Sequence, residues 1–255
     1  MKRSFFLLYG VVAYGAFVAT FLYLIGFVED VVVPRSVDSG GPAAPVTTAL
    51  LVEVTLLALF GVQHSVMARK GFKEVWTRAV PRPIERSTYV LAASTCLALL
   101  FLLWHPIPRV VWSVESLAAR MALLSLSGLG WLWALLSSFL INHFELFGLR
   151  QVYLAARRRE APHSRFRTPL LYRLVRHPLY LGFIVAFWAT PTMTVGHLVF
   201  ALGMLGYVLI AIQLEERDLV REHGNRYLAY RQQVRGLVPI PRRLPEGTEV
   251  QLQTE

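Results

Sequence analysis

The sequence predicts an all-α polytopic membrane protein with about six transmembrane helices, and three observations predict this class. Hydrophobic residues make up 55% of the chain and charged residues only 16%. The mean hydropathy is positive, at +0.48. The apolar residues also occur in long runs instead of the alternating patterns of a soluble domain. A run of about 20 apolar residues can cross a hydrocarbon core of about 30 Å, because a helix rises about 1.5 Å per residue.

The first half of the chain contains four predicted transmembrane helices. They cover Phe5–Val28, Val46–Met67, Ser87–Trp104 and Leu117–Ile141. The first run follows the basic residues Lys2 and Arg3. It is too long for the hydrophobic region of a signal peptide, and no small-residue cleavage site follows it, so we expect an uncleaved anchor.

Two further apolar runs predict a helical hairpin in the second half. They cover Pro178–Thr190 and Val195–Leu214. Pro191 and the β-branched threonines after it break the helix, so the segment between the runs is expected to be a tight turn. The first arm is short and is expected to start inside the membrane interface. The second arm is expected to leave the membrane near Gln213 and to continue as a polar cytoplasmic helix.

The loop charges predict the orientation. Basic residues crowd the second loop, which contains Arg69, Lys70, Lys73, Arg78, Arg82 and Arg86. Eight arginines lie between Arg150 and Arg176 in the fourth loop, whereas the first and third loops carry one arginine each. By the positive-inside rule, six crossings of the plasma (inner) membrane then place both termini in the cytoplasm. Anionic lipid headgroups account for the net charge of +10, so membrane lipid and not nucleic acid is the expected partner.

The chain divides into three parts. Residues 1–145 are expected to form the N-terminal transmembrane helices and residues 146–241 a C-terminal region that contains the hairpin. Residues 242–255 are polar and are expected to be disordered. The single cysteine, Cys96, lies inside an apolar run and is expected to contribute only packing. The sequence has no H-x-x-x-H motif or cysteine cluster, so no metal site is expected.

A polar segment at the start of the hairpin predicts a binding site. Pro178 suits the first turn of a helix, because its missing N–H would be unpaired there, and this places His177 at or near the N-cap. A helix N-terminus beside Arg173 and Arg176 favours a carboxylate or a phosphate. Tyr180 lies three residues beyond His177 on the same helical face. The alternative is that His177 only caps the helix and Tyr180 belongs to the interfacial aromatic belt.

The second hairpin arm carries adjacent acidic residues, Glu215 and Glu216, at the same end of the hairpin. They point about 100° apart on a helix, so only one of them can face a pocket directly. Gly224 is expected to end this helix, after which Tyr227 and Tyr230 share one face of a further helix that can fold back over the site. The alternative is that the acids pair with arginines of their own helix on a solvated surface.

Several motifs within residues 165–240 have the joint spacing of a known family. They are Tyr172, Arg176-His177-Pro178-Leu179-Tyr180-Leu181-Gly182, Glu215-Glu216 and Gly224-x-x-Tyr227-x-x-Tyr230, with Pro239 beyond them. These motifs resemble the isoprenylcysteine carboxyl methyltransferase superfamily of membrane S-adenosylmethionine enzymes. Segments outside them, at residues 142–151, 166–169 and 187–197, are similar to its NnrU-like branch and particularly to methanethiol S-methyltransferases.

The resemblance implies a site for S-adenosyl-L-methionine in residues 146–241, reached from the cytoplasm, with the acceptor reached from the bilayer. The residues that match the cofactor motif are Tyr172, His177, Pro178, Leu179, Tyr180 and Glu215. The implied reaction is methylation of a small thiol at the cytoplasmic membrane interface, in particular of methanethiol to dimethyl sulfide. The prenylcysteine branch carries an arginine four residues before the pocket glutamate. This chain has Ala211 there, so an apolar acceptor fits better than a carboxylate.

His143 is the candidate general base, because a thiol attacks best as its thiolate. Asn142 and Glu145 lie beside it at the end of the fourth predicted span and are candidate substrate-binding residues, as is His64 near the cytoplasmic end of the second span. The alternative is that Asn142, His143 and Glu145 only cap their span. Glu53, within the second span, is either functional or close enough to the outer interface to snorkel.

Two alternatives to methanethiol methylation remain open. A methyltransferase of the same kind could act on another thiol, a selenol or a lipid. A six-span transporter or accessory protein could instead use intramembrane polar side chains as a path, although the chain lacks the internal repeat that transporters often show. The sequence indicates no obligatory protein partner.

Overall fold

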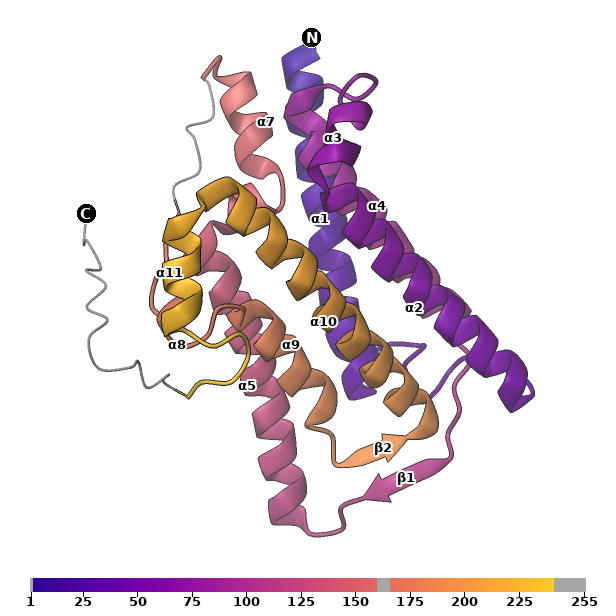
Figure 1. Cartoon of the computed structure of the whole chain (residues 1–255). Coiled ribbons are helices and arrows are strands. Elements are labelled where there is room, and N and C mark those ends of the chain that lie inside the picture. The colour runs from indigo at the N-terminus through magenta and orange to yellow at the C-terminus, as the bar shows by residue number, and fades with distance from the viewer. Residues whose placement is uncertain (1, 160–165, 241–255) are drawn as a thin grey trace, which may run out of the picture.

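The computed structural model describes residues 2–159 and 166–240 and confirms the all-α class (Figure 1). The helices are, in chain order, α1 (Lys2–Glu29), α2 (Val46–Ala68), α3 (Lys70–Trp76), α4 (Arg82–Leu103), α5 (Leu117–Ile141), α6 (His143–Leu146), α7 (Leu149–Ala156), α8 (Leu171–Leu174), α9 (Pro178–Trp188), α10 (Val195–His223) and α11 (Asn225–Gln233). Two short strands, β1 (Val110–Ser113) and β2 (Thr192–Thr194), complete the described elements. The predicted tail, residues 242–255, lies outside the described residues.

Five of the described helices, α1, α2, α4, α5 and α10, are long and apolar enough to cross a membrane, which confirms a polytopic membrane protein. The fourth predicted span coincides with α5, and the other predicted spans differ from the helices only at their ends. The fifth predicted crossing, α9, has 11 residues. It is therefore about 16 Å long, roughly half of the hydrocarbon core.

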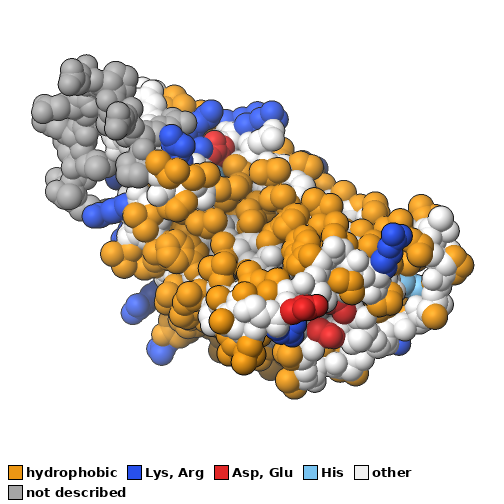
Figure 2. Space-filling view, turned by 90° about the horizontal axis from the view of Figure 1, so that it is seen from below, with side chains coloured by type: hydrophobic (Ala, Val, Ile, Leu, Met, Phe, Trp, Pro, Cys, Tyr) orange, Lys and Arg blue, Asp and Glu red, His pale blue; other side chains and the backbone are white. Residues whose placement is uncertain are grey.

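The bundle has two chemically different ends. Figure 1 shows the N-terminus, α3 and α7 at one end and the two strands at the other. The first end contains Arg69, Arg78, Arg82, Arg150 and Arg157, on α3 and α7 or beside them, and we call it the basic end. Figure 2 views the molecule from the opposite end, where hydrophobic side chains cover most of the visible surface.

The two strands form where the sequence predicts only a loop and a tight turn. β1 and β2 pair antiparallel, with Val110 opposite Thr194 and Ser113 opposite Thr192. The prediction of a simple turn is wrong, because Thr192 and Thr194 pair with β1, which lies in the loop before α5. β-branched residues such as threonine suit an extended strand. The loop before α5 is thereby tied to the hairpin.

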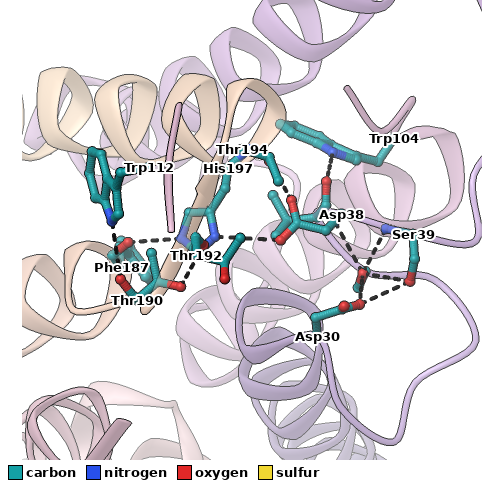
Figure 3. A network of polar contacts seen from close by, with 12 residues as sticks. Asp30, Asp38, Ser39, Trp104, Trp112, Phe187, Thr190, Thr192, Thr194 and His197 are labelled. Carbon is teal, nitrogen blue, oxygen red and sulfur yellow. Dashed lines mark hydrogen bonds and ion pairs between the residues drawn. The ribbon is translucent and has the colours of Figure 1, made fainter. Parts of the chain in front are cut away.

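A polar network fastens the first loop to the strand pair (Figure 3). The carboxylate of Asp38 accepts a hydrogen bond from the hydroxyl of Thr194. His197 donates from Nε2 to a backbone carbonyl of α9 at 2.9 Å, and Trp104 donates from Nε1 to the backbone of the first loop at 3.0 Å. His197 is therefore engaged at the end of the bundle opposite the basic end.

α9 packs chiefly against α5 and less against α10, its partner in the predicted hairpin. Gly130 of α5 and Gly182 of α9 face each other, and a Cβ atom on Gly182 would lie 2.6 Å from the backbone nitrogen of Ala134. Small residues let membrane helices approach this closely. The hydroxyl of Ser127 adds a hydrogen bond of 3.0 Å to the carbonyl of Ala186. These contacts fix the start of α9 inside the bundle.

The last two helices turn back over the start of α9. α10 ends at Gly224, whose φ of 53° lies in the left-handed region that favours glycine. Tyr227 and Tyr230 of α11 are buried, which confirms the predicted helix end and the returning helix. The hydroxyl of Tyr230 donates to the carbonyl of Tyr172, so α11 is fastened to α8.

Candidate functional site between the helices

The described residues enclose a cavity of about 410 Å³ between the helices. Side chains of α1, α2, α4, α5, α9 and α10 line it, so both predicted regions, 1–145 and 146–241, contribute. The lining combines charged and hydroxyl-bearing side chains with a larger group of aromatic and aliphatic ones. The volume lies within the range of about 300–1,000 Å³ that is typical of small-molecule sites.

His177 lies between the two predicted glutamates of α10. Its Nδ1 is 3.7 Å from Oε2 of Glu215, and its Nε2 is 3.1 Å from Oε1 of Glu216. As predicted, His177 is the N-cap residue of α9 and Pro178 begins the helix, but the His177 side chain makes no capping hydrogen bond. The alternative in which His177 only caps the helix is therefore wrong, and the two predicted clusters meet in one site.

Glu216 is the acid that joins the elements of the site. Its carboxylate lies 2.7 Å from Nη2 of Arg176 and 3.6 Å from Nε of Arg231, and its side chain is only 12% exposed. A buried carboxylate is tolerated when charged partners and hydrogen bonds surround it. The alternative in which the acids pair with arginines of their own helix fails for Glu216, because its partners come from α11 and from the segment before α9.

The chain after α11 reinforces this arrangement. The backbone N–H groups of Arg176 and His177 donate to the carbonyls of Arg235 and Gly236, at 2.8 and 3.1 Å. The Arg176 guanidinium also donates to the carbonyl of Val234. The start of α9 is therefore held from two sides, by α10 and by the segment that follows α11.

Glu215 is the acid that faces the cavity. Its side chain is 43% exposed, and it lines the cavity together with Tyr207 and Ala211, which lie about two turns and one turn earlier on α10. One glutamate faces the pocket and its neighbour faces Arg176, as the rotation of about 100° between adjacent helical residues predicts.

All of the predicted cofactor residues except Pro178 line the cavity. Pro178 is buried and begins α9, whereas Leu179 and Tyr180 follow it on the cavity wall. Tyr172 on α8 donates its hydroxyl hydrogen to a backbone carbonyl of α5 at 3.3 Å. Burial, and then the Glu215 carboxylate, raise the pKa of Tyr172 above its usual range, so this phenol stays a neutral donor at physiological pH.

His143 lines the cavity where α5 meets α6. Its buried ring stacks on Phe139, with 4.2 Å between the centroids. Nδ1 lies 2.8 Å from the hydroxyl of Ser138, and Nε2 lies 2.9 Å from the hydroxyl of Tyr14. Burial lowers the pKa of His143, so the imidazole is neutral near pH 7. Its role as the general base stays a prediction, and that role requires it to give up one of these hydrogen bonds.

Asn142 and Glu145 are not among the side chains that line the cavity. Asn142 ends α5 at a φ of 130° and donates from Nδ2 to the Glu145 carboxylate at 2.7 Å. Glu145 also forms an ion pair with Arg150. This local network is what the capping alternative predicts for these two residues, and their contact with substrate stays a prediction.

His64 lines the cavity from α2, where its ring lies 4.9 Å from that of Tyr89 and 5.9 Å from that of Tyr207, centroid to centroid. Glu53, about three turns earlier on the same helix, does not line the cavity. Its side chain is fully buried, and neither carboxylate oxygen has a hydrogen-bond partner among the described residues. The alternative that Glu53 snorkels to the outer interface is therefore wrong.

The sequence does not identify α1 and α4 as sources of site residues. Arg86 and Tyr89 of α4 line the cavity, as do Phe17 and Phe21 of α1. Their spacings of three and four residues place each pair on one helical face, and this is the signal that could have found them. The same spacing is common on lipid-facing surfaces, so only the packing shows which face turns inward.

The fold and the cavity define this protein as a polytopic α-helical membrane protein with a small-molecule site between its helices. Sequence comparison then specifies the family. The chain is 56% identical to the methanethiol S-methyltransferase of Mycobacterium tuberculosis over 243 residues, which cover 95% of this chain and 99% of that protein. It is 52% identical to the methanethiol S-methyltransferase of Crocosphaera subtropica over 240 residues, 94% of each chain. The chain therefore belongs to the methanethiol S-methyltransferase family.

A further relative lies outside this group. Nurim of Rattus norvegicus is 31% identical over 202 residues, which cover 71% of this chain and 76% of Nurim. No protein-family model matches the chain, and no solved structure matches it. The family resemblance that the motifs predict is confirmed by the relatives.

Proposed function

We propose that this protein transfers a methyl group from S-adenosyl-L-methionine to a small thiol, and that methanethiol is the acceptor and dimethyl sulfide the product. The observation that carries the proposal is 56% identity, over 95% of the chain, to a protein named for methanethiol methylation. The cavity supports it, because a site for a charged cofactor and a small apolar acceptor needs both polar and apolar walls.

The cavity residues fit the proposed cofactor. S-adenosyl-L-methionine supplies a methyl group on a positively charged sulfur, and it also carries an ammonium, a carboxylate and ribose hydroxyls. The half-exposed carboxylate of Glu215 would bind the ammonium or the ribose hydroxyls. The hydroxyl oxygens of Tyr172 and Tyr180 would accept hydrogen bonds, and the start of α9 at Leu179 favours a carboxylate. The cavity of about 410 Å³ is of the size that such ligands occupy.

The acceptor part of the cavity is expected to take an apolar thiol. Ala211 is buried and lines the cavity one turn from Glu215, and Phe183 and Met204 line the same cavity. Alanine offers no cation to an acceptor carboxylate, whereas the apolar wall stabilises a small hydrophobic molecule by removing its surface from water.

The rate acceleration is expected to come from positioning and from exclusion of water, with no covalent intermediate on the protein. Glu215 and His177 would hold the cofactor in one orientation. The ring of Phe17 stacks on that of Phe147, with 3.7 Å between the centroids, and both rings lie in the cavity wall. Such a wall would keep water from the thiol while the sulfur approaches the methyl carbon in line.

We also propose that the basic end faces the cytoplasm, with both termini on that side of the plasma (inner) membrane. The arginines of the second and fourth loops support this orientation. Labelling of intact cells with a membrane-impermeant maleimide tests it, since Cys96 is buried. An Arg78→Cys variant should resist the reagent and a Val111→Cys variant should react, and the reverse pattern would refute the orientation.

Replacing Glu215 by glutamine is expected to weaken S-adenosyl-L-methionine binding by about 10- to 100-fold, because a hydrogen bond to a charged group contributes about 1.5–3 kcal/mol. Tyr180→Phe should weaken it by a smaller factor. Binding is measured with labelled cofactor on the detergent-purified protein. The matched control is Glu222→Gln, which alters an exposed glutamate of the same helix. Unchanged affinity in both site variants would remove these residues from the site.

The proposed reaction is tested by headspace analysis. Cells that express the chain and are supplied with methanethiol should release dimethyl sulfide, and the Glu215→Gln cells should release less. Membranes are then incubated with labelled cofactor and a panel of thiols, selenols and lipids. Labelling of another acceptor but not of methanethiol would keep the methyltransferase proposal and refute the substrate.

A further inference from the structure

We propose that the guanidinium of Arg86 binds the carboxylate of S-adenosyl-L-methionine, while Glu215 binds the ammonium of the same cofactor. This inference rests on the proposed function, and it adds a cofactor-binding residue that lies far from the cofactor motif in the sequence. Among the basic residues of the second loop, Arg86 is predicted only to face lipid headgroups. The structure instead places Arg86 in the second turn of α4 and in the wall of the cavity.

Three arginines line the cavity, and two of them have a carboxylate partner. Arg69 forms an ion pair of 2.6 Å with Asp218, and Arg176 forms one of 2.7 Å with Glu216. Arg86 forms no ion pair with a carboxylate of the described residues. Because its charge is not neutralised by a neighbouring acid, Arg86 is the cavity arginine that is open to an anionic ligand.

The contacts of Arg86 fix the side chain and leave its outer nitrogens open. Nε donates to the carbonyl of Leu146 at 2.7 Å, and the guanidinium carbon lies 4.7 Å from the centroid of the Tyr89 ring. Neither Nη1 nor Nη2 has a hydrogen-bond acceptor in the part of the chain that the structure describes. A guanidinium presents its N–H groups as a planar fork that matches the two oxygens of a carboxylate. Arg86 is therefore oriented for such a ligand before the ligand binds.

Arg86 and Glu215 together match the charges of the cofactor. Glu215 is the cavity-lining acid, and its side chain is 43% exposed. The Tyr89 phenol interacts electrostatically with both Arg86 and Glu215, so the two open charges share one part of the cavity. S-adenosyl-L-methionine carries its ammonium and its carboxylate on one carbon atom. An acid from α10 and an arginine from α4 would therefore bind the two groups in one orientation.

The acceptor thiolate is a second anion that Arg86 could bind, and the polarity of the cavity wall favours the cofactor carboxylate. Along α4 the lining passes from Arg86 and Tyr89 to Ala93 and Leu97. Leu97 lies about 16 Å farther from the basic end than Arg86, at about 1.5 Å per residue. The charged groups therefore lie nearest the basic end, and the apolar surface that suits a small thiol lies deeper in the bundle.

The test measures equilibrium binding of two ligands to the full-length protein and to its Arg86→Gln variant in detergent. The ligands are S-adenosyl-L-methionine and its decarboxylated form, which keeps the sulfonium, the ammonium and the nucleoside. The unchanged protein should bind S-adenosyl-L-methionine about 10- to 100-fold more tightly, the usual effect of a hydrogen-bonded contact between charged groups. The variant should lose this preference, because its affinity for S-adenosyl-L-methionine falls while its affinity for the decarboxylated form stays the same or rises.

Two further variants make the test specific. Arg82→Gln makes the same substitution at an exposed arginine one turn earlier on α4 that does not line the cavity, and it should bind both ligands as the unchanged protein does. Arg86→Lys keeps the charge without the planar fork and should keep part of the preference.

The outcomes that would overturn the proposal do not all depend on a variant. Equal affinity of the unchanged protein for the two ligands would overturn it directly. An equal loss for both ligands in Arg86→Gln would show a structural effect. Unchanged affinities with slower methylation would assign Arg86 to the acceptor instead, and both results would overturn the proposal. An unchanged protein that binds neither ligand would refute the proposed function itself.

Discussion

Replacing Gly182 by leucine is expected to prevent α9 from docking on α5 and to abolish the folded protein. A Cβ atom at this position would lie 2.6 Å from the backbone nitrogen of Ala134 and 2.7 Å from the carbonyl oxygen of Gly130. Both are helix backbone atoms, which cannot move aside as the end of a flexible side chain can. Overpacking costs about 1–3 kcal/mol even where side chains adjust, and a total stability of about 5–15 kcal/mol leaves little reserve.

The matched control for this prediction is Gly128→Leu on α5. A Cβ atom on Gly128 would meet nothing within 4 Å beyond its own helix, and this glycine is exposed on the helix surface. Thermal unfolding and size-exclusion profiles in detergent should show an unstable or aggregated Gly182 variant and a monodisperse Gly128 variant. Because α9 carries His177 at its start, cofactor binding should disappear with the fold. Equal stability of the two variants would show that the close approach of α5 and α9 is not required.

Replacing Glu216 by alanine is expected to destabilise the C-terminal part of the molecule by about 3–5 kcal/mol, the usual cost of leaving a buried charge without its partner. The variant leaves Arg176, whose side chain is 10% exposed, and the buried His177 without the carboxylate that they share. The start of α9 and the segment after α11 should then detach. Limited proteolysis should cut this region faster, and cofactor binding should be lost.

Two comparisons make the Glu216 prediction specific. Glu215→Gln should weaken cofactor binding with little change in stability, because Glu215 is 43% exposed. The double variant Arg176→Met and Glu216→Leu removes both buried charges and should recover part of the lost stability, as hydrophobic replacement of buried ion pairs often does, without recovering cofactor binding. A Glu216→Ala protein as resistant to protease as the unchanged chain would contradict the anchoring role.

The membrane class and the helix boundaries follow from local properties of the chain. The end of α5 at Ile141, the start of α9 at Pro178 and the end of α10 before Gly224 lie where the sequence predicts them. Each of these boundaries depends on a proline, a glycine or the length of an apolar run, and these act within a few residues. The strand pair of β1 and β2 is different, because its hydrogen bonds join segments far apart in the chain.

The candidate site also has a part that the sequence predicts and a part that only the packing of distant segments decides. The sequence motif contains both Glu215 and Glu216, and a helical rotation predicts that only one faces the pocket. The packing decides which one, since Arg176 and Arg231 surround Glu216 and leave Glu215 open. The state of each histidine ring also depends on packing. His64 and His143 are both apolar-helix histidines in the sequence, and only their neighbours distinguish a free nitrogen from an engaged one.

The sequence by itself therefore determined the class of protein, the limits of the long helices and the pair of motifs that meet in the site, because hydrophobicity, helix breakers and residue spacing are local. Only the tertiary structure decided that α9 packs on α5 through Gly130 and Gly182, that α1 and α4 complete the cavity, and which acid remains open to a ligand. In an apolar chain most helix faces look alike, so close backbone contact and buried ion pairs, which act between distant segments, select the face that turns inward.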